Sequence, residues 1–229
     1  DALDHWAGTL NIVFCNTKLD CAEITDYLQS ENIAALAMHG DLEQFERTET
    51  LIQFSNQSAT VLVATDVAAR GLDIGKVDVI FNYELPNQPE MYLHRIGRTG
   101  RAGQKGRSIS LVSDKEHRRF KEIKQTFNYN NIGKFDLNRV AERSRDLLPP
   151  MTTIEVSGGR RHKLRPGDFL GAITATKEIP GAAVGKIDVL EKKTFIAINQ
   201  ANHAKAVRIL NKAPIKGKTF RARSTSLGD

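Results

Sequence analysis

The segment HRIGRTGR, residues 94–101, holds the side chains whose types and spacing are best suited to chemistry. On a helical path His94, Arg98 and Arg101 occupy positions i, i+4 and i+7, so they lie on one stripe of the surface. Guanidinium groups are always charged and bind phosphate oxygens in a forked geometry, while the two interleaved glycines add no bulk. The spacing therefore predicts a site that stabilises negative charge on a transferring phosphoryl group.

A second segment, ATDVAARGLD at residues 64–73, directly follows an apolar run. Thr65 and Asp66 come at the carboxyl end of the expected strand, where a hydroxyl can hold a phosphate. Taken alone, Thr-Asp after a strand would only cap a helix. Gly71 permits a turn that presents Asp73, whose carboxylate suits ribose hydroxyls. The segment favours a binding site for a nucleotide or a nucleic-acid backbone.

A third segment, HGDLEQFER at residues 39–47, also follows an apolar run. Gly40 can offer its backbone N–H to a phosphate at the start of a helix. Gln44 and Arg47 share one helix face at i, i+3. By itself this segment is equally compatible with a surface ion pair.

Short β-branched runs alternate with helical patterns over the first two thirds of the chain. Strands are predicted at residues 11–15, 33–38, 60–64, 77–81 and 107–112, and helices at 18–30, 43–54, 89–97 and 115–127. Strands that are apolar on both faces and separated by helices predict a parallel sheet covered on both sides. Ligands of such sheets gather at the carboxyl ends of the strands, where the three segments belong.

The last third follows another plan. Strands are predicted at residues 153–156, 184–190, 194–199 and 219–223, and helices at 167–173 and 201–210. The order β-α-β-β-α-β is ferredoxin-like and is shared by RNA-recognition modules. The predicted domains are therefore residues 1–145 and 153–229, joined by a linker at 146–152.

The formal charge of +6 is unevenly divided. Residues 1–150 carry 18 basic and 21 acidic side chains, a net charge of −3, whereas residues 151–229 carry 15 and 6, a net charge of +9. This distribution indicates a polyanion-binding surface, with a solvated basic face as the alternative. The central strand region offers only Phe195 for base stacking, so loop cations are the candidates. They are Arg160, Arg161, Lys163, Arg165, Lys216, Lys218, Arg221 and Arg223.

Several classes of protein are not expected. No apolar run approaches the roughly 18 residues that a membrane-spanning helix needs, and no signal segment opens the chain. Cys15 and Cys21 form no disulfide scaffold, and the six histidines show no metal-ligand spacing. The composition thus favours a soluble cytoplasmic protein without a metal site of its own.

The three segments, with IVFCNT at residues 12–17, closely resemble the motifs of the second RecA-like domain of DEAD-box RNA helicases, over residues 10–113. Residues 153–223 resemble the C-terminal RNA-binding domain of the DbpA branch. The resemblance implies an α/β RecA-like parallel sheet followed by a small α+β RRM-like domain. It also implies ATP with Mg²⁺ as cofactor. The implied partner is RNA, a large-subunit (23S-type) rRNA hairpin of a pre-ribosomal particle, bound by a monomer.

The resemblance also assigns roles to residues. Arg98 and Arg101 would be the arginine fingers at the γ-phosphate, Gly71 and Asp73 would contact ATP, and His94 would couple the nucleotide and RNA sites. The RNA backbone would be held by residues of the second and third segments. These are Gly40, Gln44, Arg47, Thr65, Asp66 and Arg70, of which Arg70 either contacts RNA or braces its loop.

The chain also departs from the family's pattern. It contains no G-x-x-x-x-G-K-S/T loop and no D-E-A-D, and residues 217–219 (GKT) lack the first glycine and lie in a basic strand region. The 229 residues are therefore predicted to be inactive alone. Within a full-length protein they would support an RNA-stimulated ATPase that unwinds short duplexes during ribosome assembly. A non-enzymatic RNA-binding or annealing protein is the alternative, whereas a dinucleotide-binding enzyme fails because no G-x-G-x-x-G occurs.

Overall fold

The computed structural model describes residues 2–69, 77–100, 106–129, 132–135 and 147–225. Contacts within the chain divide it into two compact units. The first unit is Asp1–Thr50 with Thr60–Leu148, and the second is Leu51–Ala59 with Pro149–Asp229. The predicted linker spans the change of unit after Leu148, and the predicted domain boundaries stay a prediction.

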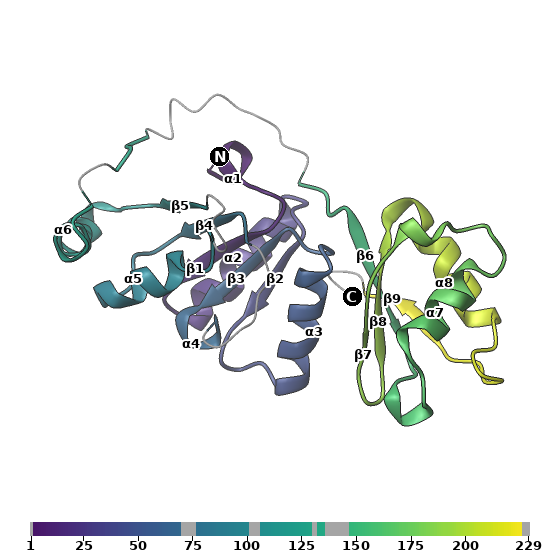
Figure 1. Ribbon diagram of the computed structural model, residues 1–229. Helices are drawn as coiled ribbons and strands as arrows, with labels where there is room; N and C mark the ends of the chain where they lie inside the picture. Colours follow the sequence, from purple (N-terminus) through teal and green to yellow (C-terminus); the bar gives the residue numbers. More distant parts are fainter. Residues whose placement is uncertain (1, 70–76, 101–105, 130–131, 136–146, 226–229) are drawn as a thin grey trace. The chain divides into compact units, whose positions relative to one another are not determined.

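The first unit is built on a five-stranded parallel sheet in the order β2-β3-β1-β4-β5 (Figure 1). Its strands are β1 (Asn11–Cys15), β2 (Ala35–Met38), β3 (Val61–Thr65), β4 (Val79–Asn82) and β5 (Arg107–Ser110). The three central strands are apolar and fully buried, as expected for parallel strands covered on both faces. The predicted α/β fold is confirmed.

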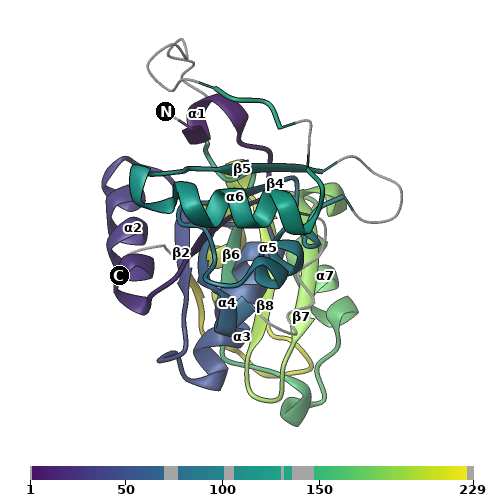
Figure 2. The ribbon, with the colours of Figure 1, turned by 90° about the vertical axis from the view of Figure 1, so that its left-hand side faces the viewer.

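The helices of this unit follow the strands in alternation. They are α1 (Ala2–Trp6), α2 (Lys18–Ser30), α3 (Gln44–Ser55), α4 (Asp66–Ala69), α5 (Pro89–Ile96) and α6 (His117–Thr126), the last preceded by the 3-10 turn η1 (Asp114–Glu116). The division into units assigns the end of α3, from Leu51, to the second unit. α2 begins as predicted because the Thr17 hydroxyl accepts a hydrogen bond from the Asp20 amide at 3.1 Å. Figure 2 shows α5 and α6 lying next to each other.

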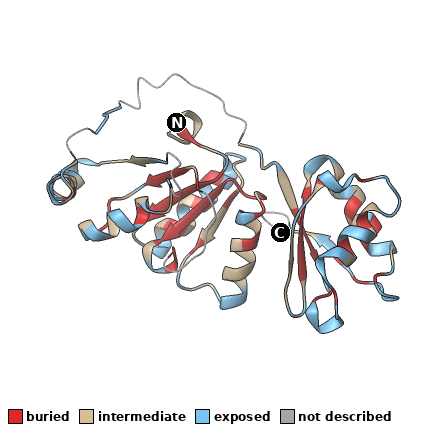
Figure 3. Cartoon of the chain, in the orientation of Figure 1, coloured by how far each residue is buried: buried red, intermediate tan, exposed pale blue. Residues whose placement is uncertain are grey.

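Alternate strand residues form the core of the first unit. Val13, Val63 and Phe81 pack with Leu28 of α2 on one face of the sheet. On the other face, the Arg95 guanidinium lies 5.0 Å from the centre of the Phe14 ring. Figure 3 shows buried residues concentrated on the central strands. The strands whose carboxyl ends carry the candidate site are thus the most buried part of the sheet.

The second unit has a four-stranded antiparallel sheet in the order β7-β8-β6-β9. Its elements are β6 (Met151–Val156), η3 (Arg160–His162), α7 (Pro166–Thr174), η4 (Gly181–Ala183), β7 (Val184–Val189), β8 (Thr194–Asn199), η5 (Gln200–Asn202), α8 (His203–Lys212) and β9 (Ala222–Ser224). Both helices lie on one face of the sheet (Figure 1) and enclose Ile154, Phe169, Ile196 and Leu210. The predicted α+β plan is confirmed.

The last strand begins later than predicted. Residues 219–221 are not in the ladder, and β9 starts at Ala222. A tight turn, in which Ile215 and Lys218 exchange backbone hydrogen bonds, precedes it. Gly217 in that turn has φ +77°, a conformation that glycine adopts without strain. The chain then buries Phe220 in the core before it reaches the sheet.

Candidate functional site

Polar side chains gather at the carboxyl edge of the parallel sheet. Asn16 follows β1, Asp66 follows β3, and Asn82 ends β4. Thr65 is the last residue of β3 and is mostly buried beside the equally buried Cys15. Because all five strands are parallel, these residues meet at one edge.

Arg95 of α5 connects them. It is 1% exposed, and its five N–H groups all donate hydrogen bonds. Two reach the Asp66 carboxylate at 2.6 and 2.8 Å, two reach the side-chain oxygens of Asn16 and Asn82 at 3.0 and 3.3 Å, and one reaches the Glu84 carbonyl at 2.6 Å. A buried charge is tolerable only when it is paired and satisfied in this way.

A small pocket of about 270 Å³ opens beside this pair. It is lined by Asn16, Thr65, Asp66, Val67, Asn87, Gln88 and Met91. Hydroxyl and amide groups line it together with the apolar side chains of Val67 and Met91, and the carboxylate of Asp66 is bound by Arg95. A pocket of this chemistry suits a sugar or phosphate group.

The predicted arginine stripe is not one continuous helix. α5 ends at Ile96, and the next amides continue helical turns as far as Thr99. There the path changes, because the Thr99 hydroxyl donates to the carbonyls of Val77 and Asp78 at 2.6 and 3.1 Å, and Gly100 has φ +69°. The i, i+4 part of the stripe is therefore present, and the i+7 residue, Arg101, lies outside the described residues.

The described members of the stripe lie at the end of α5. His94 is exposed in its last turn and Arg98 is half-buried. Four other predicted residues lie outside the described residues, so the structure places none of them: Arg70, Gly71, Asp73 and Arg101.

The third segment lies at the start of α3. Gly40 is exposed, with open space where a side chain would stand, and Gln44 is exposed at the first helical residue. Arg47 donates to the Ala68 carbonyl of α4 at 3.1 Å, so it also ties the second and third segments together. The nearby Asp41 accepts a 2.7 Å bond from Lys18, which holds the pKa of that carboxyl below its usual value.

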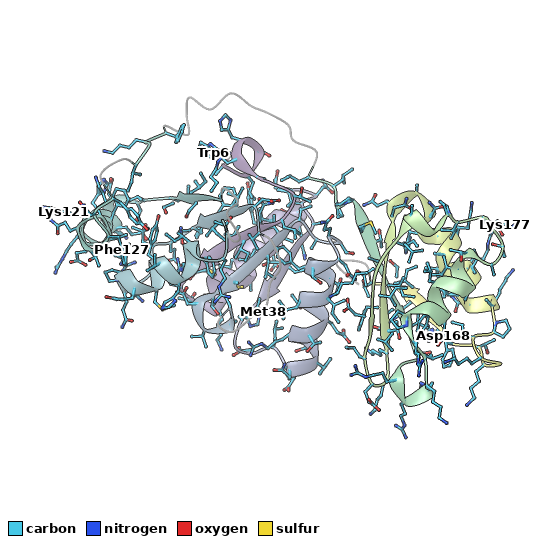
Figure 4. All side chains as sticks on the ribbon, in the orientation of Figure 1. Trp6, Met38, Lys121, Phe127, Asp168 and Lys177 are labelled. Atoms are coloured by element: carbon cyan, nitrogen blue, oxygen red, sulfur yellow. The ribbon has the colours of Figure 1, made fainter. Side chains whose placement is uncertain are left out.

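The basic loops of the second unit lie side by side. Lys216 forms a 2.8 Å ion pair with Asp168 of α7 and donates to the Lys163 carbonyl at 2.6 Å, while the His162 and Phe220 rings meet edge to face. Asp168, in the first turn of α7, is labelled in Figure 4. The hydrogen bond from the Lys216 side chain lowers the pKa of the Asp168 carboxyl, and Arg165 lowers it further. Two segments that are far apart in sequence thus build one basic surface.

The predicted RNA-binding cations differ in their partners. Arg160 lies 3.9 Å from Glu191, and Arg223 lies 3.1 Å from Glu155, which Lys193 also approaches at 3.3 Å. By contrast, some predicted cations are exposed and form no ion pair within the part of the chain that the structure describes. They are Arg161, Lys163, Arg165, Lys218 and Arg221. Phe195 is fully buried, so it offers no ring to a base.

Sequence reasoning missed Arg95 and two of the three amide residues of the pocket, Asn87 and Gln88. Arg95 lies next to the predicted stripe, and one residue corresponds to about 100° around a helix. It therefore faces the sheet when His94 faces solvent. A carboxylate directly after a strand and an arginine in a helix's inward face are the signal that would have paired Asp66 with Arg95.

Two kinds of feature are absent from the described residues. No helix among them combines the length and apolar character needed to cross a membrane. No group of three or more histidine, cysteine or acidic side chains among them is placed to hold a metal ion.

Two protein families match the chain in succession. The family "Helicase conserved C-terminal domain" matches residues 3–103, and "DbpA RNA binding domain" matches residues 153–224. Together with the parallel sheet and its edge of polar residues, these matches show that the chain belongs to the helicases in which this C-terminal domain is followed by a DbpA RNA binding domain.

Similar proteins define the branch. The ATP-dependent RNA helicase DbpA of Escherichia coli is 44% identical over 216 residues, which is 93% of this chain and 46% of that protein. DbpA of Bacillus subtilis is 30% identical over 92% of this chain and 48% of that protein. The chain thus carries the DbpA type of RNA-binding domain and spans about half the length of these relatives.

One solved structure is similar to about half of this chain. The E. coli DEAD-box protein SrmB, solved bound to the regulator of ribonuclease activity A, has a TM-score of 0.53 and 38% identity. The match covers 55% of this chain and 74% of that one.

Proposed function

We propose that the chain is the carboxyl-terminal part of an ATP-dependent RNA helicase that binds a large-subunit (23S-type) rRNA hairpin and unwinds short duplexes nearby during ribosome assembly. The observation that carries the proposal is the joining of two features in one chain. A helicase C-terminal unit has polar side chains at the carboxyl edge of its sheet, and it is followed by a DbpA-type unit with a basic surface. A monomer acting in the cytoplasm fits this role.

In this proposal, different residues bind the RNA backbone and the γ-phosphate of ATP. Thr65, Gly40 and Arg47 lie on neighbouring segments at the carboxyl edge, where hydroxyl, amide and guanidinium groups hold an RNA backbone. Arg98, with Arg101, approaches the γ-phosphate and stabilises the charge that develops there. ATP supplies the free energy, and the described residues of this chain do not build a site for its Mg²⁺.

The test joins this chain to the part of the E. coli relative that it does not match. We expect an RNA-stimulated ATPase, in which Arg98→Ala lowers kcat by about 10³-fold or more, as arginine fingers do. Arg118→Ala is the matched control, because Arg118 is exposed on α6 and pairs along its own helix with Glu122. Equal kcat for Arg98→Ala and the control would refute the arginine-finger assignment.

The alternative, a non-enzymatic RNA-binding or annealing protein, predicts a different result from the same fusion. RNA would bind, annealing would proceed, and no ATP turnover would follow RNA addition. That outcome would reject the helicase proposal while leaving the RNA-binding unit intact.

A further inference from the structure

The Arg95–Asp66 pair lies where the proposed RNA site needs a neutral surface. Asp66 directly follows Thr65, is 21% exposed, and lines the same pocket. Carboxylates accept hydrogen bonds and do not donate them, so Asp66 cannot hold a phosphate oxygen. Left unpaired, it would repel the RNA backbone.

The size of that repulsion makes neutralisation necessary. Two like charges 6 to 8 Å apart near a protein surface repel strongly enough to weaken binding by roughly 30- to 100-fold. In the structure both Asp66 oxygens accept bonds from Arg95, which is itself nearly inaccessible to solvent. The buried guanidinium cancels the carboxylate's charge without presenting a cation of its own to the RNA.

The same guanidinium also fixes the frame of the pocket. Its other donors hold Asn16 after β1, Asn82 on β4 and the backbone at Glu84. Asn16 lines the pocket and also donates to the Leu85 carbonyl at 3.0 Å. Arg95 thereby connects the carboxyl ends of β3, β1 and β4, three successive strands of the sheet, of which β3 carries Thr65.

We propose that Arg95 is a positioning residue whose guanidinium neutralises Asp66, so that the pocket beside Thr65 accepts a phosphate of RNA. Its bonds to the ends of the strands stabilise the fold at this edge of the sheet. This inference rests on the proposed function and changes the role expected for Asp66. Instead of contacting the RNA backbone, Asp66 is the anion that must be masked before the backbone can approach.

The test separates charge from shape in the fusion with the E. coli relative, with RNA-stimulated ATPase measured at a temperature where every variant is folded. Arg95→Met exposes the Asp66 charge, and we expect the KM for RNA to rise about tenfold or more. Adding Asp66→Asn removes the charge and returns that KM to within about threefold of the parent. Arg95→Lys keeps the positive charge but loses the planar set of N–H donors of the guanidinium. We therefore expect a lower Tm with a nearly unchanged KM for RNA.

The salt dependence of the KM for RNA distinguishes an effect of charge from a purely structural effect of Arg95. Screening weakens repulsion between exposed charges, so the KM ratio of Arg95→Met to the parent falls as ionic strength rises. The exposed pair Arg118 and Glu122 gives the matched control through Arg118→Met and Arg118→Met/Glu122→Gln, which leave the KM for RNA unchanged.

Each outcome is decisive. An unrescued KM in the double variant, or a salt-independent ratio, overturns the inference while the parent fusion still hydrolyses ATP. A parent fusion without RNA-stimulated turnover rejects the proposed function instead. If Arg95→Met does not fold, Asp66→Asn alone decides: a KM for RNA within about threefold of the parent supports masking, and a tenfold rise restores Asp66 as an RNA contact.

Discussion

At the scale of single residues, partners decide what a charge can do. Arg95 and Arg161 carry the same group, yet Arg95 is enclosed by five acceptors and Arg161 is exposed. Arg223 lies between these cases, since it shares Glu155 with Lys193. Residue type alone could not sort them, because the acceptors come from segments distant in sequence.

His203 offers a residue-scale prediction. Burial lowers its pKa from the ordinary value of 6.5, and its buried Nε2 has no hydrogen-bond partner among the described residues. The folded chain therefore keeps the ring neutral at a pH where the unfolded chain takes up a proton. The contribution of His203 to the free energy of unfolding should therefore be greatest above pH 6.5, and this free energy should decrease as the pH falls below that value.

Urea denaturation between about pH 7.5 and 5 measures this effect. His203→Phe replaces the unpartnered nitrogen by carbon, and we expect it to reduce the pH dependence. His117→Phe is the control, because His117 is exposed at the start of α6. Identical pH profiles for the parent and His203→Phe would contradict the prediction.

At the scale of elements, local signals predicted the start of a capped helix better than the start of the last strand. The helix at 18–30 was predicted to the residue, because its cap lies in the adjacent sequence. The strand expected at 219–223 was displaced, since its start depends on a tight turn and on Phe220 entering a core made by other elements. The helical path after α5 likewise ends at Thr99, because the Thr99 hydroxyl bonds to carbonyls of Val77 and Asp78, which belong to an earlier segment of the chain.

Gly159 gives an element-scale prediction. A Cβ at this position would meet the backbone carbonyls of Leu190 and Glu191, which cannot move like the end of a side chain. The same carbonyls accept the Arg160 and Arg161 amides at 2.8 and 3.0 Å and so dock the basic loop on the β7–β8 turn. We expect Gly159→Ala to lower the free energy of unfolding by about 1–3 kcal/mol.

Gly167 is the matched control, since a Cβ there has open space and the residue lies in the first turn of α7. Gly167→Ala should leave stability unchanged or raise it slightly, by up to about 1 kcal/mol. Thermal and urea denaturation measure both variants. Equal stability of the two would show that the loop does not need its close approach to the β7–β8 turn.

At the scale of the whole molecule, charge is divided between the two units. The net charge of +9 on residues 151–229 contrasts with −3 on residues 1–150, and the structure brings loop cations from two segments onto one surface. Because Phe195 is buried, we expect RNA recognition by this unit to depend on these cations and on base-edge contacts. The composition predicted the surface, but the pairing of Lys216 with Asp168 needed the fold.

The last prediction concerns RNA binding by the whole chain. Each cation that neutralises a phosphate releases counterions, so the logarithm of affinity for an rRNA hairpin falls linearly with the logarithm of salt concentration. Removing the exposed cations with Arg161→Ala, Lys218→Ala and Arg221→Ala together should reduce the slope by about 2 to 3, roughly 0.7–0.9 for each phosphate that is no longer neutralised. Arg208→Ala is the control, because Arg208 is paired with Glu178 at 3.2 Å and should change the slope little. Fluorescence anisotropy from about 50 to 300 mM KCl measures both variants. A triple variant with the parent's slope would show that the RNA lies on another surface of this chain.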